Sequence, residues 1–236
     1  MLRVNLVTLF PEVFRVPFST SILGRAQERG LVQYRVVQLR DYAHDRHQTV
    51  DDYAYGGGAG MVLKPEPFFE ALDHLGARAP IVLLSARGRP FRHDDAVRFS
   101  VSEELTLLCG HYKDVDQRVA ARDGVEELSV GEFVLSGGEF AALCVVDAVV
   151  RLLPGAMGDH ESAAADSYYE GSLLSPPSYT RPPVYRGHAV PEVLLSGDHE
   201  KVAEWRRAEA ERLTRSRRPD LWTRYQDAVH RSNGTV

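Results

Sequence analysis

Residues Ser129 to Glu139 read S-V-G-E-F-V-L-S-G-G-E and stand directly before a long apolar run. Ser136 and Glu139 are three residues apart, the spacing of a capping box, in which each side chain bonds a backbone N–H of the first helical turn. The residues between them are glycines, which destabilise a helix, so this pair needs a reason. One reason is close approach of another group to the backbone, which a side chain at Gly137 or Gly138 would block. The alternative is a plain turn before a buried helix.

The composition is typical of a soluble globular protein with one large domain or two modest ones. The chain has 236 residues, of which 44% are hydrophobic and 26% are charged. No apolar run is as long as a membrane span, and residues 1–6 enter a strand-like pattern without the layout of a signal peptide. Cys109 and Cys144 lie in apolar runs, which suits buried thiols in a reducing compartment. Neither has a Cys or His at metal-ligand spacing, so we expect a cytoplasmic protein without a structural metal.

The net charge of −5 is unevenly distributed along the chain. Between Lys201 and Arg231, nine Lys and Arg residues stand against five Asp and Glu, a surplus of four positive charges. The rest of the chain has nineteen against twenty-eight, which gives −9. A basic C-terminal part is either a solvated helix face or an electrostatic footprint for phosphate.

Strand-like and helix-like patterns alternate through the first two thirds of the chain. We expect strands at residues 4–10, 31–39, 81–84, 105–108 and 125–128. We expect helices at about residues 20–29, 65–75, 93–99, 114–122 and 140–153, with a polar loop at residues 40–60. This alternation predicts an α/β fold with a mostly parallel sheet.

The last third of the chain has a different character. Small and polar residues after Gly158 read as a flexible linker. Beyond it we expect a small helical domain whose first helix starts near Asp198 and turns Val202, Trp205 and Ala208 inward. A second helix starts at Pro219. We therefore divide the chain into a ligand-binding domain (1–158), a linker (159–171) and a helical domain (172–236).

Three of the predicted strands end in loops that suit a ligand site. Ligands of parallel sheets bind beyond the carboxyl ends of the strands. The loops begin Leu84-Ser85-Ala86, Gly110-His111-Tyr112 and Val130-Gly131, all in the second half of the α/β region. The first strand is followed by Phe10-Pro11-Glu12 and has no G-x-G-x-x-G, so the usual dinucleotide fingerprint is missing. The sequence therefore predicts a ligand in an unusual place for this class of fold.

Two further features each allow two interpretations. The glycine-dense loop 55–61, Y-G-G-G-A-G-M, lacks the Gly-Lys-Ser/Thr ending of a phosphate-binding P-loop. It is either a mobile loop that grips a flat or bulky ligand or a plain hinge. Asp147 and Arg151 interrupt the apolar run 140–153 at i, i+4 spacing. They form either a surface salt pair or part of a subunit interface in which Arg151 faces a site.

Six segments, in order, resemble the bacterial tRNA (guanine-N1)-methyltransferases, the TrmD family of the SPOUT superfamily. They are H-D-R-H-Q-T-V-D-D (44–52), Y-G-G-G-A-G-M (55–61), L-L-C-G-H-Y (107–112), S-V-G-E-F-V-L-S-G-G-E (129–139), Y-T-R-P-P (179–183) and L-L-S-G-D-H (194–199). The resemblance implies a trefoil knot that forms an S-adenosylmethionine site at the C-terminal end of the first domain. It also implies a homodimer, and methylation of the guanosine just 3′ of the tRNA anticodon.

The resemblance also implies which residues bind the cofactor. They are Leu84, Ser85, Ala86, Gly110, Tyr112, Val130, Gly131, Glu132, Phe133, Val134, Leu135, Gly137 and Gly138. The family commonly has proline where Ala86 stands, and an acid near the cofactor where this chain has Lys113.

The chemistry of guanine N1 calls for two further groups. N1 carries a proton at neutral pH, so its methylation requires a base, and the negative charge that develops on O6 requires a cation or donor. In the family pattern the base matches Asp166, which serves the partner subunit's cofactor, and the cation matches Arg151. The transfer itself needs no metal, although Mg²⁺ assistance is compatible with the sequence. The expected RNA contacts are Arg46, His47, Asp51, Gly57, Gly58, Ser167, Arg181, Ser196, Arg206 and Arg215.

Two alternative functions stay open at this point. A knotted protein with an altered site would hold RNA without methylating it, and Lys113 favours this interpretation. A SPOUT enzyme acting on ribosomal RNA is the second. The glycine loop 55–61 and the basic C-terminal part argue against it, because the resemblance connects both with tRNA.

Overall fold

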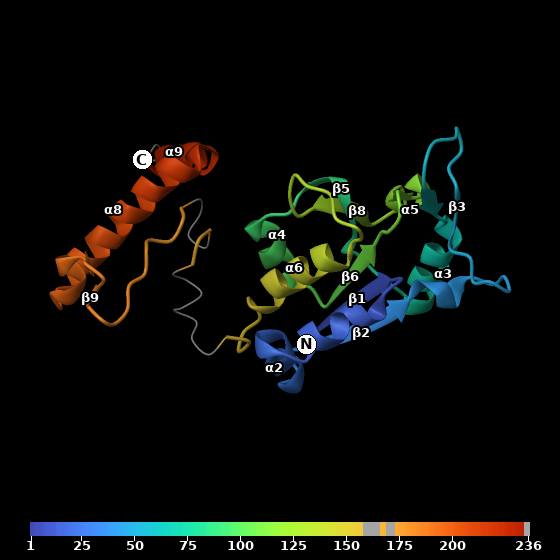
Figure 1. Ribbon diagram of the computed structural model, residues 1–236, viewed down its shortest axis with the longest axis horizontal. Coiled ribbons are helices and arrows are strands. Elements are labelled where there is room, and N and C mark those ends of the chain that lie inside the picture. The colour runs from blue at the N-terminus through green and yellow to red at the C-terminus, as the bar shows by residue number, and fades with distance from the viewer. Residues whose placement is uncertain (158–165, 169–172, 234–236) are drawn as a thin grey trace. The chain divides into compact units, whose positions relative to one another are not determined.

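The computed structural model describes residues 1–157, 166–168 and 173–233, and contacts within the chain divide it into two compact units (Figure 1). The first unit is Met1–Gly158 and the second is Asp159–Val236. The predicted linker, residues 159–171, lies mostly outside the described residues. Its flexibility and the separate roles of the two domains therefore stay predictions.

The first unit alternates strands and helices along the chain. Its elements are β1 (Leu2–Thr8), η1 (Pro11–Phe14), α1 (Arg15–Phe18), α2 (Ser21–Glu28), β2 (Val32–Gln38), η2 (Leu39–Tyr42), β3 (Asp51–Tyr53), β4 (Met61–Leu63), α3 (Pro65–Leu75), β5 (Ile81–Pro90), α4 (His93–Ser100), β6 (Glu104–Cys109), β7 (Asp114–Val115), α5 (Gln117–Ala120), β8 (Val125–Ser129) and α6 (Glu139–Val150). The five strands predicted from the sequence are all present, and α3 has the predicted bounds.

These five strands form one sheet in the order β2-β1-β6-β5-β8, with every pair parallel. Residues Val4 and Leu6 of β1 pack with α2, α4 and α6 on one face, whereas Val7 packs with α3 and α5 on the other. Both faces of the sheet are covered over much of their area, which is why its strands read as nearly continuous apolar runs. The prediction of an α/β fold with a parallel sheet is confirmed.

A second, three-stranded sheet was not expected. It has the order β3-β4-β7, in which β3 lies within the predicted polar loop 40–60 and pairs antiparallel with β4 directly after that loop. Val62 pairs with Asp114 and Leu63 with Val115, so β4 is joined in parallel to β7. The sheet therefore attaches the glycine loop, which connects β3 to β4, to the segment that follows β6.

The helix predicted over residues 114–122 is wrong in its first part. Asp114 and Val115 form β7, because β4 offers them a pairing partner. The helix α5 starts only at Gln117, where the Asp116 carboxylate accepts the Arg118 backbone N–H at 2.9 Å. Asp116 is therefore the N-cap residue, and pairing with the distant strand β4 outweighs the helical pattern before it.

The capping box predicted before α6 is also wrong. Helix α6 begins at Glu139 with Gly138 as its N-cap, and no side chain caps it. The Glu139 carboxylate is buried and instead accepts the hydroxyl of Thr8, at 2.7 Å, at the end of β1. A long-range hydrogen bond between buried groups has replaced the local one, and Ser136 stays in the preceding loop.

One stripe of α6 is not buried within the chain. Phe140, Cys144 and Asp147 are exposed, at the i, i+4 and i+7 positions of a single helix face. The expectation that both cysteines are buried therefore holds for Cys109 and is wrong for Cys144. Most of the remaining α6 side chains pack into the core, as the apolar run predicts.

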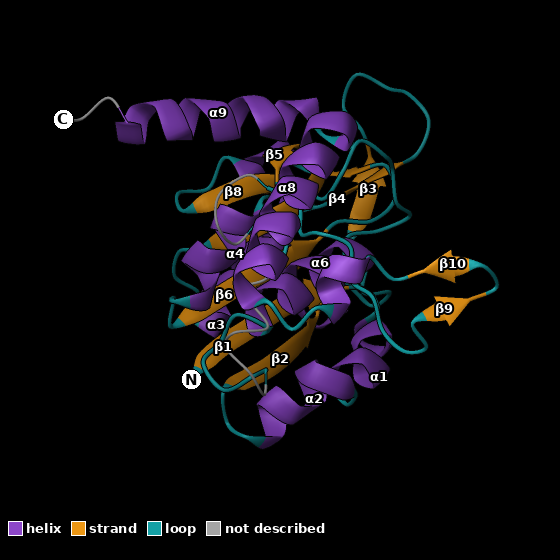
Figure 2. Cartoon of the chain, turned by 90° about the vertical axis from the view of Figure 1, so that its left-hand side faces the viewer, coloured by secondary structure: helices purple, strands orange, loops and turns teal. Residues whose placement is uncertain are grey.

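The described residues of the second unit are built around two helices. Its elements are β9 (Val184–Tyr185), β10 (His188–Ala189), η3 (Glu192–Leu195), α8 (His199–Arg217) and α9 (Pro219–Asn233). The β9–β10 hairpin, visible in Figure 2, was not expected. Asp198 caps α8 by accepting the Lys201 backbone N–H at 3.2 Å. The buried α8 residues are Ala210, Leu213 and Thr214.

The predicted inward face of α8 is therefore only partly right. Val202 and Trp205 are half-buried, whereas Ala208 is exposed, and the buried residues Ala210, Leu213 and Thr214 lie further along α8. Among the described residues, no helix combines the length and apolar character that a bilayer span requires. In that same part of the chain, no three His, Cys, Asp or Glu side chains are grouped as metal ligands would be.

Candidate functional site

A cleft of about 210 Å³ lies beyond the carboxyl ends of β6, of β8 and of the first part of β5, residues 81–84. These three strands are neighbours in the sheet, so the loops that follow them converge at one edge. The loops span residues 85–88, 110–115 and 130–138, and all three contribute to the cleft wall. Segments from three separate parts of the sequence thus meet at one place.

The first wall interrupts strand β5. Leu128 of β8 is opposite Leu84 and then again opposite Arg89, so residues 85–88 leave the ladder between those two points. Ser85, Ala86 and Arg87 line the cleft. The Arg87 guanidinium bonds the Asp114 carboxylate at 3.1 Å and 3.2 Å, and this pair connects the first wall to the second.

The second wall follows β6 and is closely packed. A Cβ atom at Gly110 would lie 2.9 Å from the Val115 side chain, so a larger residue there would force a shift of this wall. Tyr112 adopts a left-handed conformation at φ 59°, and its hydroxyl accepts from Arg40 at 3.4 Å. The Lys113 backbone N–H donates to Met61 at 3.1 Å, which holds the end of the glycine loop against this wall.

The third wall, residues 130–138, returns across the end of β6. The Gly138 backbone N–H donates to the Gly110 carbonyl at 2.8 Å, and Gly137 forms a β-bridge with His111. A Cβ atom at Gly138 would lie 2.8 Å from the Cα atom of Cys109. The group that approaches this glycine is therefore the protein's own backbone. The sequence indicated a close approach but not which group makes it.

The cleft contains twelve of the thirteen residues expected to bind a cofactor. Glu132 is the exception, because it is exposed on loop 130–138 and does not line the cleft. His111, which belongs to the predicted loop Gly110-His111-Tyr112, also lines the cleft. Further lining residues were not singled out as contacts: Leu83, Arg87, Lys113, Asp114, Val115, Leu128, Ser129, Ser136 and Ala141. Their signal in the sequence is adjacency, since most of them flank a predicted contact. Cofactor binding by these residues stays a prediction.

His111 has an unusual environment on the cleft wall. In the described part of the chain, its Nδ1 is the only buried side-chain nitrogen or oxygen without a hydrogen-bond partner. Its ring packs against Phe10 and Tyr112, with centroids 4.8 Å and 5.2 Å away. A buried polar atom that lacks a partner costs free energy, so it is suited to accept or donate a bond to a bound molecule.

The RNA contacts predicted in the first unit lie on the loops that flank β3. Gly57 and Gly58, at φ 79° and 108°, belong to the loop that leads into β4. Arg46 and His47 are exposed on a turn held by Asp45, whose carboxylate accepts both N–H and O–H bonds of Thr49 at 2.7 Å and 2.8 Å. These bonds lower the pKa of Asp45 below its ordinary value. Asp51 begins β3 and is half-buried.

The RNA contacts predicted in the second unit are spread along its elements. The Ser167 and Ser175 hydroxyls are 3.0 Å apart, so they share a hydrogen bond. The Ser196 hydroxyl donates to the Val193 carbonyl at 2.7 Å, in the turn before α8. The other predicted contacts are exposed: Arg181, Arg206 and Arg215.

The two predicted catalytic residues belong to different units. Arg151 is the half-buried C-cap residue of α6 in the first unit, and its backbone N–H donates to Asp147 at 3.2 Å. Asp166 is an exposed residue of the second unit. Their meeting in one site therefore stays a prediction.

A larger cavity, of about 780 Å³, lies at the opposite, amino ends of the strands. Its lining includes Arg3, Asn5, Arg35 and Glu104. Arg3 and Glu104 pair at 3.2 Å, so part of this polar lining is mutually satisfied. None of the cofactor-binding, RNA-binding or catalytic residues predicted from the sequence lines this cavity. Size alone is a poor guide here, and the smaller cleft is the stronger candidate because three converging loops build it.

The fold and the cleft together are those of an α/β ligand-binding protein. Its site is built from strand-end loops, one of which, residues 130–138, returns to the end of β6 and bonds Gly110 through Gly138. Comparison with known proteins gives the family. Residues 2–224 match the family model described as tRNA (Guanine-1)-methyltransferase TrmD. The chain therefore belongs to this family.

Individual relatives agree with the family assignment over nearly the whole chain. A tRNA (guanine-N(1)-)-methyltransferase of Dehalococcoides mccartyi strain CBDB1 is 49% identical over 225 residues, which cover 94% of this chain and 90% of that protein. The Geobacillus kaustophilus protein of the same name is 46% identical over 227 residues, 95% of this chain and 93% of that protein. The similarity spans both units.

Proposed function

We propose that this protein transfers the methyl group of S-adenosylmethionine to N1 of the guanosine immediately 3′ of the anticodon in tRNA, a reaction of the cytoplasm. The main support is that the predicted cofactor-binding loops converge on one cleft. The strand-end loops that the family resemblance assigns to cofactor binding line a single cleft, although they lie far apart in the sequence. Family membership over residues 2–224 supports the substrate.

The residues of the cleft fit S-adenosylmethionine. Its walls combine apolar side chains such as Leu84 and Leu135 with glycines such as Gly110 and Gly137, which leave space beside the main chain. His111 adds a buried Nδ1 whose hydrogen-bonding capacity is unused. An adenosine-containing ligand needs both an apolar slot and a few fixed polar groups, and the residues of the cleft supply both. The bound sulfonium would supply an activated methyl group for in-line transfer.

The protein's own groups then handle the proton and the charge of the guanine. The Asp166 carboxylate would accept the proton from N1. Bound S-adenosylmethionine would supply the methyl group, and its sulfur would keep the electron pair of the C–S bond. The Arg151 guanidinium meets the negative charge that develops on O6. The roles of these two residues rest on the family resemblance, and Mg²⁺ assistance is an additional possibility to test.

A homodimer with shared sites follows from the same resemblance and has support in the exposed apolar surface. Phe133 and Phe140 are 57% and 61% exposed, and Val134 is 87% exposed, on the loop and helix that adjoin the cleft. Such a group of large apolar side chains is typical of an interface. Phe140→Glu should convert the dimer into a monomer in sedimentation analysis. A monomeric wild-type protein would contradict the shared-site proposal.

We also propose that loop 130–138 and α6 complete the trefoil knot. In support, the chain leaves β8 at the edge of the sheet and returns past β5 to bond Gly110 at the end of β6. Pulling the unfolded chain from its two ends should leave it shorter than its full contour length, because a knot would tighten instead of opening. Recovery of the full length would refute the knot.

One experiment tests the proposed activity against its alternatives. Purified protein is incubated with methyl-labelled S-adenosylmethionine and either unmodified tRNA transcript or ribosomal RNA. Label at N1 of the guanosine 3′ of the anticodon is the expected result. Label only in ribosomal RNA would favour the other SPOUT reaction, and tRNA binding without label would favour a binding protein.

A further inference from the structure

The first wall of the cleft, residues 85–88, is a loop inside strand β5, and we call this loop the detour. Strand β5 leaves its ladder after Leu84 and rejoins it at Arg89, and both residues pair with Leu128. The chain between them, residues 85–88, supplies the first wall of the cleft. The positions of the two ends therefore decide where that wall stands.

The two ends of the detour are held differently. At the departing end, Leu84 pairs with β6 on one side and with β8 on the other. At the rejoining end, Arg89 and Pro90 pair with β8 alone. Proline has no backbone N–H to contribute to a ladder. The rejoining end therefore needs another anchor if the loop is to keep one shape.

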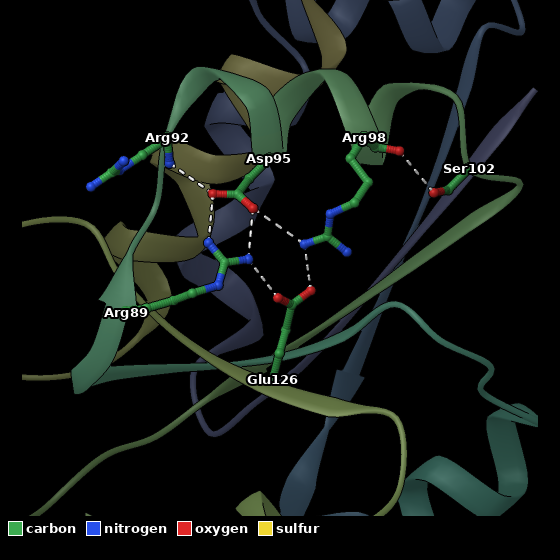
Figure 3. Close-up of polar contacts among 6 residues, drawn as sticks. All are labelled: Arg89, Arg92, Asp95, Arg98, Ser102 and Glu126. Carbon is green, nitrogen blue, oxygen red and sulfur yellow. Dashed lines mark hydrogen bonds and ion pairs between the residues drawn. The ribbon is translucent and has the colours of Figure 1, made fainter. Parts of the chain in front are cut away.

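A ring of four charged side chains supplies that anchor (Figure 3). The Arg89 guanidinium bonds both oxygens of Asp95, at 2.7 Å and 2.9 Å, and one oxygen of Glu126 at 2.7 Å. Arg98 closes the ring, with 2.7 Å to Glu126 and 3.3 Å to Asp95. Its members come from β5, α4 and β8, and we call these four residues the clasp.

Asp95 is the centre of the clasp. It is buried, and it also accepts the Arg92 backbone N–H at 2.9 Å. Burial alone would raise the pKa of Asp95, but the bonds from Arg89, Arg92 and Arg98 outweigh it and hold this pKa below its ordinary value. The carboxylate is therefore charged at neutral pH, and the forked contact with Arg89 fixes direction as well as distance.

The clasp is better suited to fixing a conformation than to adding stability. Arg89 and Arg98 each keep about half of their side-chain surface exposed, at 49% and 47%. Partly exposed ion pairs add little net stability, and removing a charge from water offsets much of what a buried pair gains. The two parallel bonds from Arg89 to Asp95 instead fix the position of Arg89, the residue after Gly88, relative to helix α4. Gly88 has no room for a side chain, because a Cβ there would lie 2.5 Å from the Leu128 nitrogen.

We propose that Arg89, Asp95, Arg98 and Glu126 are positioning residues that hold loop 85–88 in its cleft-forming shape. They touch no reacting group. They act by fixing the point at which β5 resumes, and so the wall against which the cofactor would bind. The identity of that ligand rests on the proposed function, whereas the effect of the clasp on the loop does not.

The first test needs no ligand. Hydrogen exchange of peptides spanning residues 83–89 is compared between wild type, Glu126→Gln, Arg89→Lys and Arg89→Met. Arg3→Gln is the matched control, since it breaks an ion pair of similar exposure between β1 and β6 at the opposite end of the sheet. We expect exchange in 83–89 to accelerate at least about tenfold in Arg89→Met, and less in the two milder variants, with no change in peptides of β6. Unchanged exchange in 83–89 for all three clasp variants would overturn the proposal.

The second test asks whether the loop shape matters to the site. In Arg89→Met we expect KM for S-adenosylmethionine to rise about tenfold, with kcat at saturation changed less than twofold. Arg89→Lys keeps the charge but not the fork, so its KM should lie between the two. A fall in kcat at unchanged KM, or an equal KM change in Arg3→Gln, would refute positioning through the clasp. If wild type binds no S-adenosylmethionine, the proposed function fails, while the exchange result still decides the role of the clasp.

Discussion

The cleft of the first unit is built from three loops that pack closely against one another, whereas the charged surface of the second unit includes the exposed arginines of helix α8. Around the cleft, Gly110 and Gly138 sit against backbone or closely packed atoms that cannot move independently. Along α8, the arginine side chains are exposed, and Arg207 and Arg212 bond only neighbouring side chains at the surface. A substitution in the first region therefore displaces several segments at once, while a substitution in the second changes one charge. We expect all-or-none effects from the former and graded, salt-dependent effects from the latter.

The largest effect is expected from Gly138→Val. The smallest added atom would already lie 2.8 Å from the Cys109 Cα and 3.0 Å from the Gly110 nitrogen, so the end of β6 must shift. Overpacking of this kind costs about 1–3 kcal/mol of folding free energy, and often more for a branched residue. Displacing the end of β6 should also weaken S-adenosylmethionine binding by at least about 100-fold. Thermal unfolding and calorimetric titration measure the two effects.

The matched control for that variant is Gly76→Ala. Gly76 ends α3 in a left-handed conformation at φ 60°, with no atom within 4 Å of its added Cβ. Alanine there should lose about 1–2 kcal/mol through backbone strain, yet leave the cofactor affinity unchanged. If both variants bound S-adenosylmethionine equally well, the cleft would not depend on the contact between Gly138 and β6.

The next largest effect concerns the proposed chemical groups. Asp166→Asn and Arg151→Ala should each lower methyl transfer by about 10²–10⁴ at saturating substrates, because one removes the base and the other the cation for O6. Cofactor affinity should stay at the wild-type level, since neither residue lines the cleft. Single-turnover transfer and calorimetry on the same samples measure both quantities.

Mixing these two inactive variants tests whether sites are shared between protomers. A heterodimer contains one site with both groups intact if Asp166 serves the partner's cofactor. Up to about a quarter of wild-type activity should therefore return after subunit exchange, since half of the dimers are mixed and each has one working site. Mixtures that stay inactive would place both groups in the same protomer's site.

The regular part of the fold could be read from the sequence because local signals and tertiary packing agree there. The core strands are continuous apolar runs, and α3 is bounded by Pro65 and by Gly76 at its left-handed end. The same agreement located the three loops of the cleft, because the carboxyl ends of neighbouring parallel strands must meet at one edge.

The predictions of local structure were wrong where a group bonds a partner far away in the sequence instead of one nearby. The Glu139 carboxylate bonds Thr8, 131 residues away, instead of capping its own helix. Asp114 and Val115 pair with β4 instead of starting a helix. The clasp could not be predicted either, since Arg89 and Glu126 are 37 residues apart and their types alone suggest solvated charges. The register shift in β5, which the sequence does not reveal, places Arg89 next to Asp95 and Glu126.

The smallest effect, and the finest test of the comparison, is expected on α8. Arg215 and Arg212 are exposed on the same helix. Arg212 bonds the Glu209 carboxylate at 2.7 Å, whereas Arg215 has no hydrogen-bond or ion-pair partner among the described residues. If the second unit holds tRNA through phosphate contacts, Arg215 is available for one and Arg212 is already engaged.

Arg215→Gln and Arg212→Gln remove the same charge from the same helix, so they change the long-range field of the unit by similar amounts. A phosphate contact has an additional signature, because it releases a counterion from the RNA. Arg215→Gln should therefore reduce the slope of log affinity for tRNA against log salt by about one, while Arg212→Gln should lower affinity slightly and leave the slope near wild type. Filter binding of tRNA between low and moderate salt measures this slope. Equal slopes for the two variants would mean that α8 attracts tRNA only through its overall charge, and that the basic helix face is solvated after all.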